Sequence, residues 1–138
     1  ERAKEALYEV SEGDVRRVEN ILQSSAAIGK DITEETIYSM ASVAKPKEVD
    51  EVLKLAVEKK FIEARSKLMD VMLNYGLSGL DIIKQIQQEI LNLDISNESK
   101  MKLMEKCGEI EFRMTEGSDE FIQLEALLSQ FVLYGSKK

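Results

Sequence analysis

The stretch FIEARSKLMDVMLNYGLSGLDIIKQIQQEI, residues 61–90, indicates the fold class of this 138-residue chain. Its first half repeats apolar residues every three or four positions, which is the spacing of one face of an α-helix. These residues are Phe61, Ala64, Leu68, Met72 and Tyr75. Gly76 ends that helix, because glycine readily takes the left-handed conformation found at helix ends. Ser78 and Asp81 then form a Ser-x-x-Asp signal for the start of the next helix. That helix contains Ile83, Ile86 and Ile90.

The same periodicity extends outward in both directions and predicts helices along the whole chain. Towards the C-terminus it predicts helices over about 97–115 and 119–134. Towards the N-terminus it predicts helices over about 2–10, 14–27 and 33–44, the last of them capped by Thr33. Another begins at Pro46 and carries the apolar residues Val49, Val52, Leu53 and Ala56. Since no stretch alternates as a strand does, the predicted fold is all-α.

The dipeptide Lys45-Pro46 is the best candidate for a domain boundary. A residue before proline is biased out of the helical region, whereas proline suits the first turn of the next helix. We therefore expect two parts, residues 1–45 and residues 46–138, with the larger part a helical bundle.

The last predicted helix is apolar nearly all round, with ten apolar residues among the fourteen of 121–134. A helix of that kind is buried on several sides. Two interpretations remain open, namely a central core helix and a contact with a neighbouring subunit, and the two can hold together. The candidate interface residues on this helix and its partner 97–115 are Ile110, Met114, Phe121, Leu124, Leu128 and Phe131.

Composition excludes several classes of site. The chain has no histidine and one cysteine, Cys107, so the usual zinc sites, a Ser-His-Asp triad and an internal disulfide are impossible. We expect no metal, and the single thiol fits a reducing cytoplasm (or a nucleus, if the source is eukaryotic). The net charge of −7 argues against independent nucleic-acid binding. No apolar run approaches the roughly 18 residues that span a bilayer, so no membrane contact is expected.

No complete catalytic site is present in the sequence. The only Gly-Lys, Gly29-Lys30, is followed by Asp31 and lacks the earlier glycine of a phosphate-binding P-loop. Acidic pairs such as Glu34-Glu35 are typical of solvated helix starts. We therefore assign no catalytic residue.

The segment SEGDVRRVENILQ, residues 11–23, has an unusual cation at a helix start. Arg16 falls in the first turn, where the helix dipole disfavours positive charge. A phosphate approached by both a helix N-terminus and a guanidinium is one physical reason for such an arginine. A solvated surface charge is the alternative.

This segment resembles the sensor-2 motif of the AAA+ clamp-loader ATPases, specifically the replication factor C small subunits. The pattern Gly-x-x-Arg-x-x-x-Asn is matched by Gly13, Arg16 and Asn20. Further similarity to that family follows in order at 32–46, 74–83 and 111–128. The resemblance implies a C-terminal fragment, with part of the family's lid domain at 1–45 and its collar domain at 46–138.

The resemblance also implies a function. In the family, collars hold related subunits in a ring, and the ATPase domains open a sliding clamp and place it on primer–template DNA. The lid arginine, here Arg16, would contact the phosphates of ATP bound by the ATPase domain, whose motifs this chain lacks. We therefore expect no enzyme activity and no bound cofactor in the chain itself. Its expected partners are other small and large clamp-loader subunits, including copies of itself, with the clamp and DNA contacted by the absent domain.

An independent helix-turn-helix module over 14–44 is the alternative from another class. Its recognition helix would be about 34–44, which has two acidic residues and no lysine or arginine. That composition suits an approach to phosphates poorly.

Overall fold

The computed structural model describes residues 2–11, 16, 20, 23 and 33–135. Within these residues every regular element is an α-helix, so the predicted all-α class is confirmed. The helices are α1 (Arg2–Ser11), α3 (Glu34–Met40), α4 (Pro46–Val57), α5 (Phe61–Tyr75), α6 (Gly79–Ile90), α7 (Asn97–Thr115) and α8 (Glu120–Tyr134). The helix expected over 14–27 lies outside the described residues, apart from three isolated positions.

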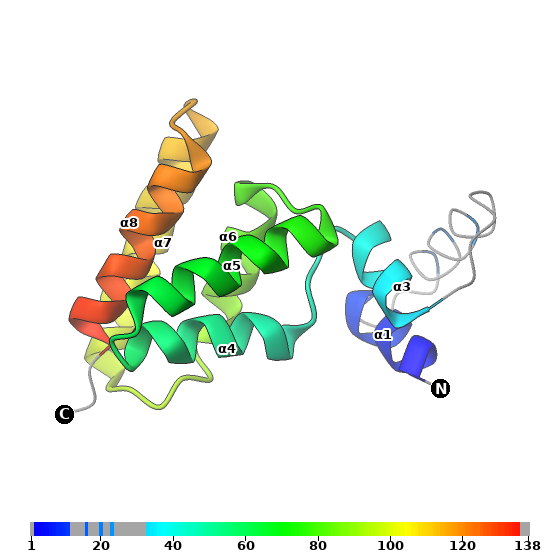
Figure 1. Cartoon of the computed structure of the whole chain (residues 1–138), viewed down its shortest axis with the longest axis horizontal. Helices are drawn as coiled ribbons and strands as arrows, with labels where there is room; N and C mark the ends of the chain where they lie inside the picture. Colours follow the sequence, from blue (N-terminus) through cyan, green and yellow to red (C-terminus); the bar gives the residue numbers. More distant parts are fainter. Residues whose placement is uncertain (1, 12–15, 17–19, 21–22, 24–32, 136–138) are drawn as a thin grey trace.

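Helices α4 to α8 form a bundle, and α1 and α3 lie together at one end of it (Figure 1). Helix α4 packs against α5, α6 and α8, while α7 and α8 form a hairpin that also contacts α6. Of the helices outside the bundle, α3 touches it through α5. Pro46 stands in the first turn of α4, as expected, and the preceding Lys45 is extended.

The apolar faces predicted from periodicity meet in one core. Helix α4 contributes its whole predicted stripe, and α6 contributes its isoleucines. The residues with the largest fully buried side chains include Leu53, Ile82, Ile86, Leu103, Leu124, Leu127, Leu128 and Phe131. Burial of such side chains stabilises a fold by roughly 1.5–3 kcal/mol each, before the entropy lost on ordering the chain. Helix α8 buries one face, made of Leu124, Leu127, Leu128 and Phe131, in this core and contacts α4, α5, α6 and α7.

Local capping rules account for most helix starts. Ser78 and Asp81 form a reciprocal capping box at α6, as the sequence predicted. Thr33 accepts a hydrogen bond from the amide of Thr36, which confirms it as the cap of α3. Ser96 and Asp119 cap α7 and α8 in the same way.

Four helices end in a turn in which a backbone amide donates a hydrogen bond to the carbonyl of the residue five positions earlier. Gly76 and Gly117 supply the left-handed residue after α5 and α7. Ser42 and Lys59 supply it after α3 and α4, with φ of 57° and 68°. The expectation that the third helix reaches Ala44 is therefore wrong. Ser42 turns the chain out of the helix after Met40, and the amide of Val43 then bonds the carbonyl of Tyr38.

Candidate functional site

Arg16, the expected nucleotide contact, is a helical and exposed residue in the structure. Asn20 of the same pattern is exposed as well, whereas Gly13 lies outside the described residues. An exposed guanidinium is accessible to a ligand. The role of Arg16 stays a prediction.

Most of the candidate interface residues lie inside the chain's own core. Ile110, Met114, Leu124, Leu128 and Phe131 are buried. Phe121 is the exception, because 45% of its surface is exposed. The last helix buries one face in the chain's own core and leaves Phe121, Ile122 and Leu133 exposed, so its contact with a neighbouring subunit stays a prediction. A contact with another subunit would therefore use different side chains on α7 and α8.

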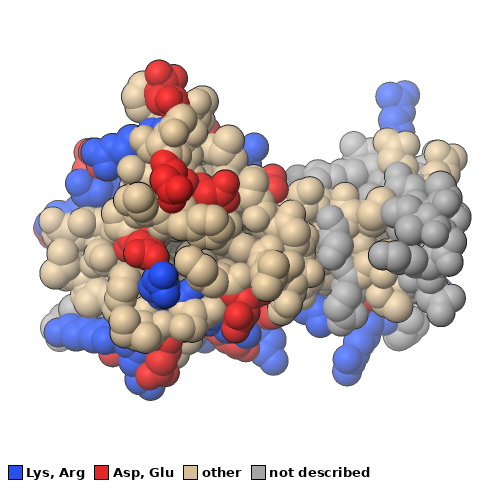
Figure 2. Space-filling model, turned by 45° about the horizontal axis from the view of Figure 1, so that its top comes forward, with Lys and Arg blue, Asp and Glu red and all other residues tan. Residues whose placement is uncertain are grey.

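Exposed apolar side chains are available at both ends of the α7–α8 hairpin. Near the Gly117 turn, Phe112 and Ile122 join Phe121, with 63% and 66% of their surfaces exposed. At the other end Leu133 and Tyr134 are exposed, and the Lys102 ammonium lies 5.2 Å from the centre of the Tyr134 ring. On the face shown in Figure 2, acidic and basic side chains are interspersed and form no continuous basic area. The exposed apolar side chains make both hairpin ends suited to apolar contacts.

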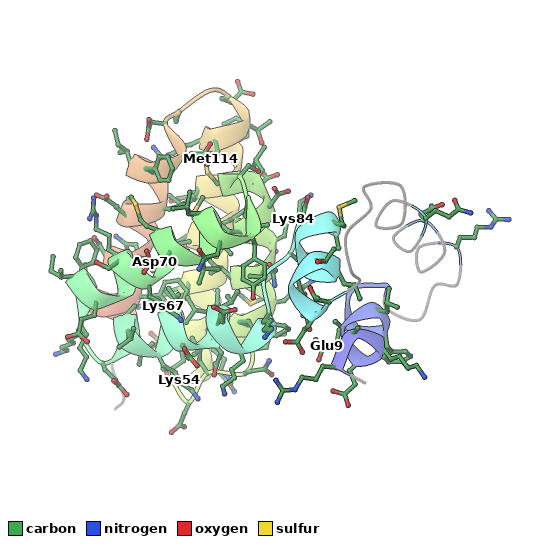
Figure 3. The ribbon with its side chains drawn as sticks, turned by 45° about the vertical axis from the view of Figure 1, so that its right-hand side comes forward. Glu9, Lys54, Lys67, Asp70, Lys84 and Met114 are labelled. Atoms are coloured by element: carbon green, nitrogen blue, oxygen red, sulfur yellow. The ribbon has the colours of Figure 1, made fainter. Side chains whose placement is uncertain are left out.

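The junction between α3 and the bundle is the most elaborate polar arrangement in the described residues. Gln85, on α6, accepts a hydrogen bond from the amide of Ala44 at 2.7 Å and donates one to the carbonyl of Ala44 at 2.8 Å. A cavity of about 400 Å³ adjoins this pair and is lined by Glu9, Tyr38, Asp81 and Lys84, among others. Figure 3 labels Glu9 and Lys84, which line it from α1 and α6.

Two tyrosines extend the junction. The hydroxyl of Tyr38 on α3 donates to Glu9 on α1, and the hydroxyl of Tyr75 on α5 donates to Glu48 on α4. The two rings meet edge to face, with centroids 6.3 Å apart. Burial, together with the hydrogen bond to the Glu9 carboxylate, raises the pKa of Tyr38 above the ordinary value for a phenol.

An ion pair closes the junction. Lys45, in the connector, pairs with Glu34 at the start of α3. The sequence patterns include Lys45, Glu34 and Tyr75 for other reasons, but they predict none of these pairings and do not single out Gln85. The available signal was a polar residue, Gln85, next to the apolar stripe of Ile82 and Ile86.

Two features of the described residues bear on metal binding and thiol chemistry. No group of three or more His, Cys, Asp and Glu side chains is placed to hold a metal within the described part of the chain. Cys107 is buried on α7, and burial raises the pKa of its thiol to about 12. A thiol held neutral in this way is a core group rather than a nucleophile.

Comparison with known proteins decides the family. Residues 44–130 match the model of the replication factor C C-terminal domain. The chain belongs to this family. Replication factor C small subunits are also similar to it along its length. The one from Pyrococcus horikoshii is 46% identical over 138 residues, and the one from Methanocella arvoryzae is 46% identical over 134 residues.

These relatives are much longer than this chain. The alignments cover all of it in the Pyrococcus comparison and 97% of it in the Methanocella comparison. They span only 16% and 42% of the respective relatives. A third, from Staphylothermus marinus, is 45% identical over 99% of the chain and is also covered over 42% of its length. Among the described residues, no helix is long and apolar enough to cross a membrane.

Proposed function

We propose that this chain is the C-terminal part of a subunit of a DNA sliding-clamp loader. The observation that carries the proposal is the family match over 44–130, together with about 45% identity to replication factor C small subunits along the whole chain. In this role the bundle is a collar that holds subunits in a ring. Chemistry belongs to an ATPase domain that these residues do not include, and the site of action is the cytoplasm.

The division of labour within the chain is part of the proposal. Residues 46–138 are the collar and residues 1–45 are part of the lid. The family match begins at residue 44, close to the Lys45-Pro46 boundary, and α1 and α3 stand apart from the bundle in Figure 1. Both observations support a boundary at this position.

The ring contact would be made by the exposed apolar residues near the Gly117 turn, in place of the buried set inferred from sequence. Phe112, Phe121 and Ile122 are the side chains concerned. A head-to-tail contact closes into a ring when the rotation between subunits allows it. Partners of the same kind, small and large clamp-loader subunits, would cover these residues.

Arg16 is the proposed sensor of ATP. Its guanidinium would contact the nucleotide's phosphates when the ATPase domain binds ATP, and lid rotation would then alter the ring. The helix-turn-helix alternative gains no support, because α3 has only seven residues, buries Ile37 and Tyr38, and pairs Glu34 with Lys45.

The experiment that tests the function uses the longer protein in which this chain is joined to its ATPase domain. Arg16→Ala should lower ATP-dependent clamp loading at limiting ATP and leave the circular dichroism unchanged, because an exposed arginine contributes little to stability. Arg17→Ala, which removes a charge outside the motif, is the matched control. Equal loading rates in wild type and Arg16→Ala would remove the arginine from the mechanism, and no loading by the wild-type assembly would refute the clamp-loader function.

A further inference from the structure

We infer that Gln85 is a positioning residue that fixes the angle between the α1–α3 pair and the α4–α8 bundle. The inference concerns a joint within this chain and goes beyond the proposed function, since it requires neither ATP nor a ring. Its starting point is the paired hydrogen bonding of one side-chain amide with both backbone groups of Ala44.

A side-chain amide is the group best suited to hold a peptide unit in this way. It offers an acceptor oxygen and a donor NH2 in one plane, so it can satisfy the amide and the carbonyl of a single residue together. Ala44 is fully buried. Its backbone groups therefore lack water as an alternative partner, and leaving them unpaired is strongly unfavourable. The connector is held in place because moving away from Gln85 would leave the amide and the carbonyl of Ala44 without hydrogen-bond partners.

The connector is restrained at further points around Ala44. Lys45 pairs with Glu34, Pro46 has a fixed φ, and Ser42 already stands in the left-handed region. The edge-to-face contact of Tyr38 with Tyr75 holds α3 against α5. Residues 41–45 contain no glycine. A hinge absorbs motion through a few residues free to change φ and ψ, and this segment offers little of that freedom.

The consequence is that the two parts move as one body while the Gln85 pair is intact. A rotation of the α1–α3 pair would be transmitted to α6 and the bundle instead of being lost in the connector. The cavity lined by Glu9, Tyr38, Lys84 and Gln85 lies beside the joint and gives the connector space to move into when the pair breaks.

The first test measures the distance between the two parts in the 138-residue chain. Spin labels are attached at Lys4→Cys on α1 and Glu105→Cys on α7, both exposed positions, in a Cys107→Ala background. Pulsed electron resonance should give one narrow distance distribution. Gln85→Leu should broaden it at least twofold and raise the exchange rate of the Ala44 amide at least tenfold. Gln88→Leu, an exposed neighbour on α6, is the matched control and should change neither.

The second test separates hydrogen bonding from packing. Gln85→Glu at about pH 8 presents a carboxylate to the Ala44 carbonyl and should broaden the distribution. A protonated carboxyl again offers one donor and one acceptor, and the ordinary pKa of glutamate is about 4.3, so lowering the pH to about 3.5 should restore the narrow distribution. The charged or titratable groups that face this position are Glu9, Tyr38, Asp81 and Lys84. The wild type keeps these four groups and is the control. Its distance distribution should not change over the same pH range.

The outcomes are decisive in either direction. A narrow distribution in folded Gln85→Leu, a broad distribution in the wild type, or no recovery of Gln85→Glu at low pH would each overturn the inference. If Gln85→Leu loses its helical circular dichroism, the Gln85→Glu titration alone decides. Since both tests report distances inside one chain, failure of the clamp-loader proposal would leave their results unchanged, and the reverse is also true.

Discussion

The amide of Gly79, at the start of α6, lies 2.7 Å from Oε1 of Glu120, at the start of α8. Two helix starts that are 41 residues apart in the sequence are thereby joined. The carboxylate satisfies one of the amides that a helix start leaves without a partner, and its negative charge also suits the dipole of α6. The approach is close, because a Cβ on Gly79 would lie 2.7 Å from both Glu120 Cβ and Met114 Sδ.

This contact predicts opposite outcomes for two glycine substitutions. Gly79→Ala should lower the free energy of unfolding by about 1–3 kcal/mol, because overpacked atoms must shift. At Gly108, in the interior of α7, an added Cβ would have no neighbouring atom within 4 Å. Gly108→Ala should therefore raise the free energy of unfolding by about 1 kcal/mol, because alanine has the higher helix propensity. Urea titration of both variants measures the difference. If both substitutions stabilise the chain to the same extent, the close approach of α6 and α8 is wrong.

The left-handed Lys59 predicts a stabilising substitution. A residue with a Cβ at φ 68° is strained by about 1–2 kcal/mol, and glycine is not. Glycine loses more conformational entropy on folding than lysine does, which offsets part of this gain. Lys59→Gly should therefore raise the free energy of unfolding by about 0.5–1 kcal/mol. Lys60→Gly is the control and should lower stability, because φ of Lys60 is −98° and no strain is relieved there. Thermal unfolding followed by circular dichroism compares them, and a lower midpoint for Lys59→Gly would contradict the prediction.

Cys107 predicts a loss of stability at alkaline pH. Its pKa is about 12 in the folded chain against an ordinary value of 9.0. The raised pKa means that the unfolded chain gives up this proton first, so the contribution of Cys107 is complete below pH 9 and is lost as the pH rises towards 12. At about pH 10.5 the loss is about 2 kcal/mol.

The measurement compares urea midpoints of wild type and Cys107→Ala at about pH 8 and pH 10.5. Lysines and tyrosines titrate in both proteins, so their effects cancel in the difference. The wild type should fall further than the variant over this interval. Equal losses in the two proteins would mean that the Cys107 thiol ionises as readily in the folded as in the unfolded chain.

A pair of charge substitutions on α8 separates folding from assembly. Leu128→Glu places a carboxylate where no surface is exposed and should unfold the bundle, because an unpaired buried charge is among the largest single destabilisations. Phe121→Glu, at a half-exposed position, should keep the helical signal and shift the proposed self-association towards monomer. Leu91→Glu, exposed on the α6–α7 connection, is the control for added charge.

Light scattering at several concentrations, with circular dichroism on the same samples, distinguishes these effects. A wild-type chain that remains monomeric at high concentration would refute homo-oligomerisation through the hairpin. So would a Phe121→Glu variant that associates as strongly as the wild type and as Leu91→Glu.

Local rules were enough to predict the helices of the bundle. The limits of α5 and α7 agree with the sequence prediction, because apolar spacing, Gly76 and the turn at Gly117 define them within a few residues. The end of α3 was missed because Ser42 occupies a position where glycine is usual, and nothing nearby in the sequence signals it.

Long-range features were beyond the sequence patterns. Periodicity showed that α8 is apolar on several sides but not which chain covers each side, so buried residues such as Leu124 and Phe131 were candidates for an interface. Gln85 meets Ala44 across 41 residues, and only the packed structure brings them together. Arg16 was singled out by its place in the first turn of a predicted helix and by a motif resemblance, and its role stays a prediction.

The contact of α4 with α8 gives the bundle a distinct order of assembly. Neighbouring pairs such as α4–α5 and α7–α8 need only short loops to close and can form quickly, whereas α4 and α8 are separated by three other helices. Phe131 is the last buried residue of the core in chain order, so it is synthesised after all the other buried core residues. A chain that lacks α8 would expose the apolar surfaces of α4 and α5 that α8 covers, which favours aggregation until the last helix has been made.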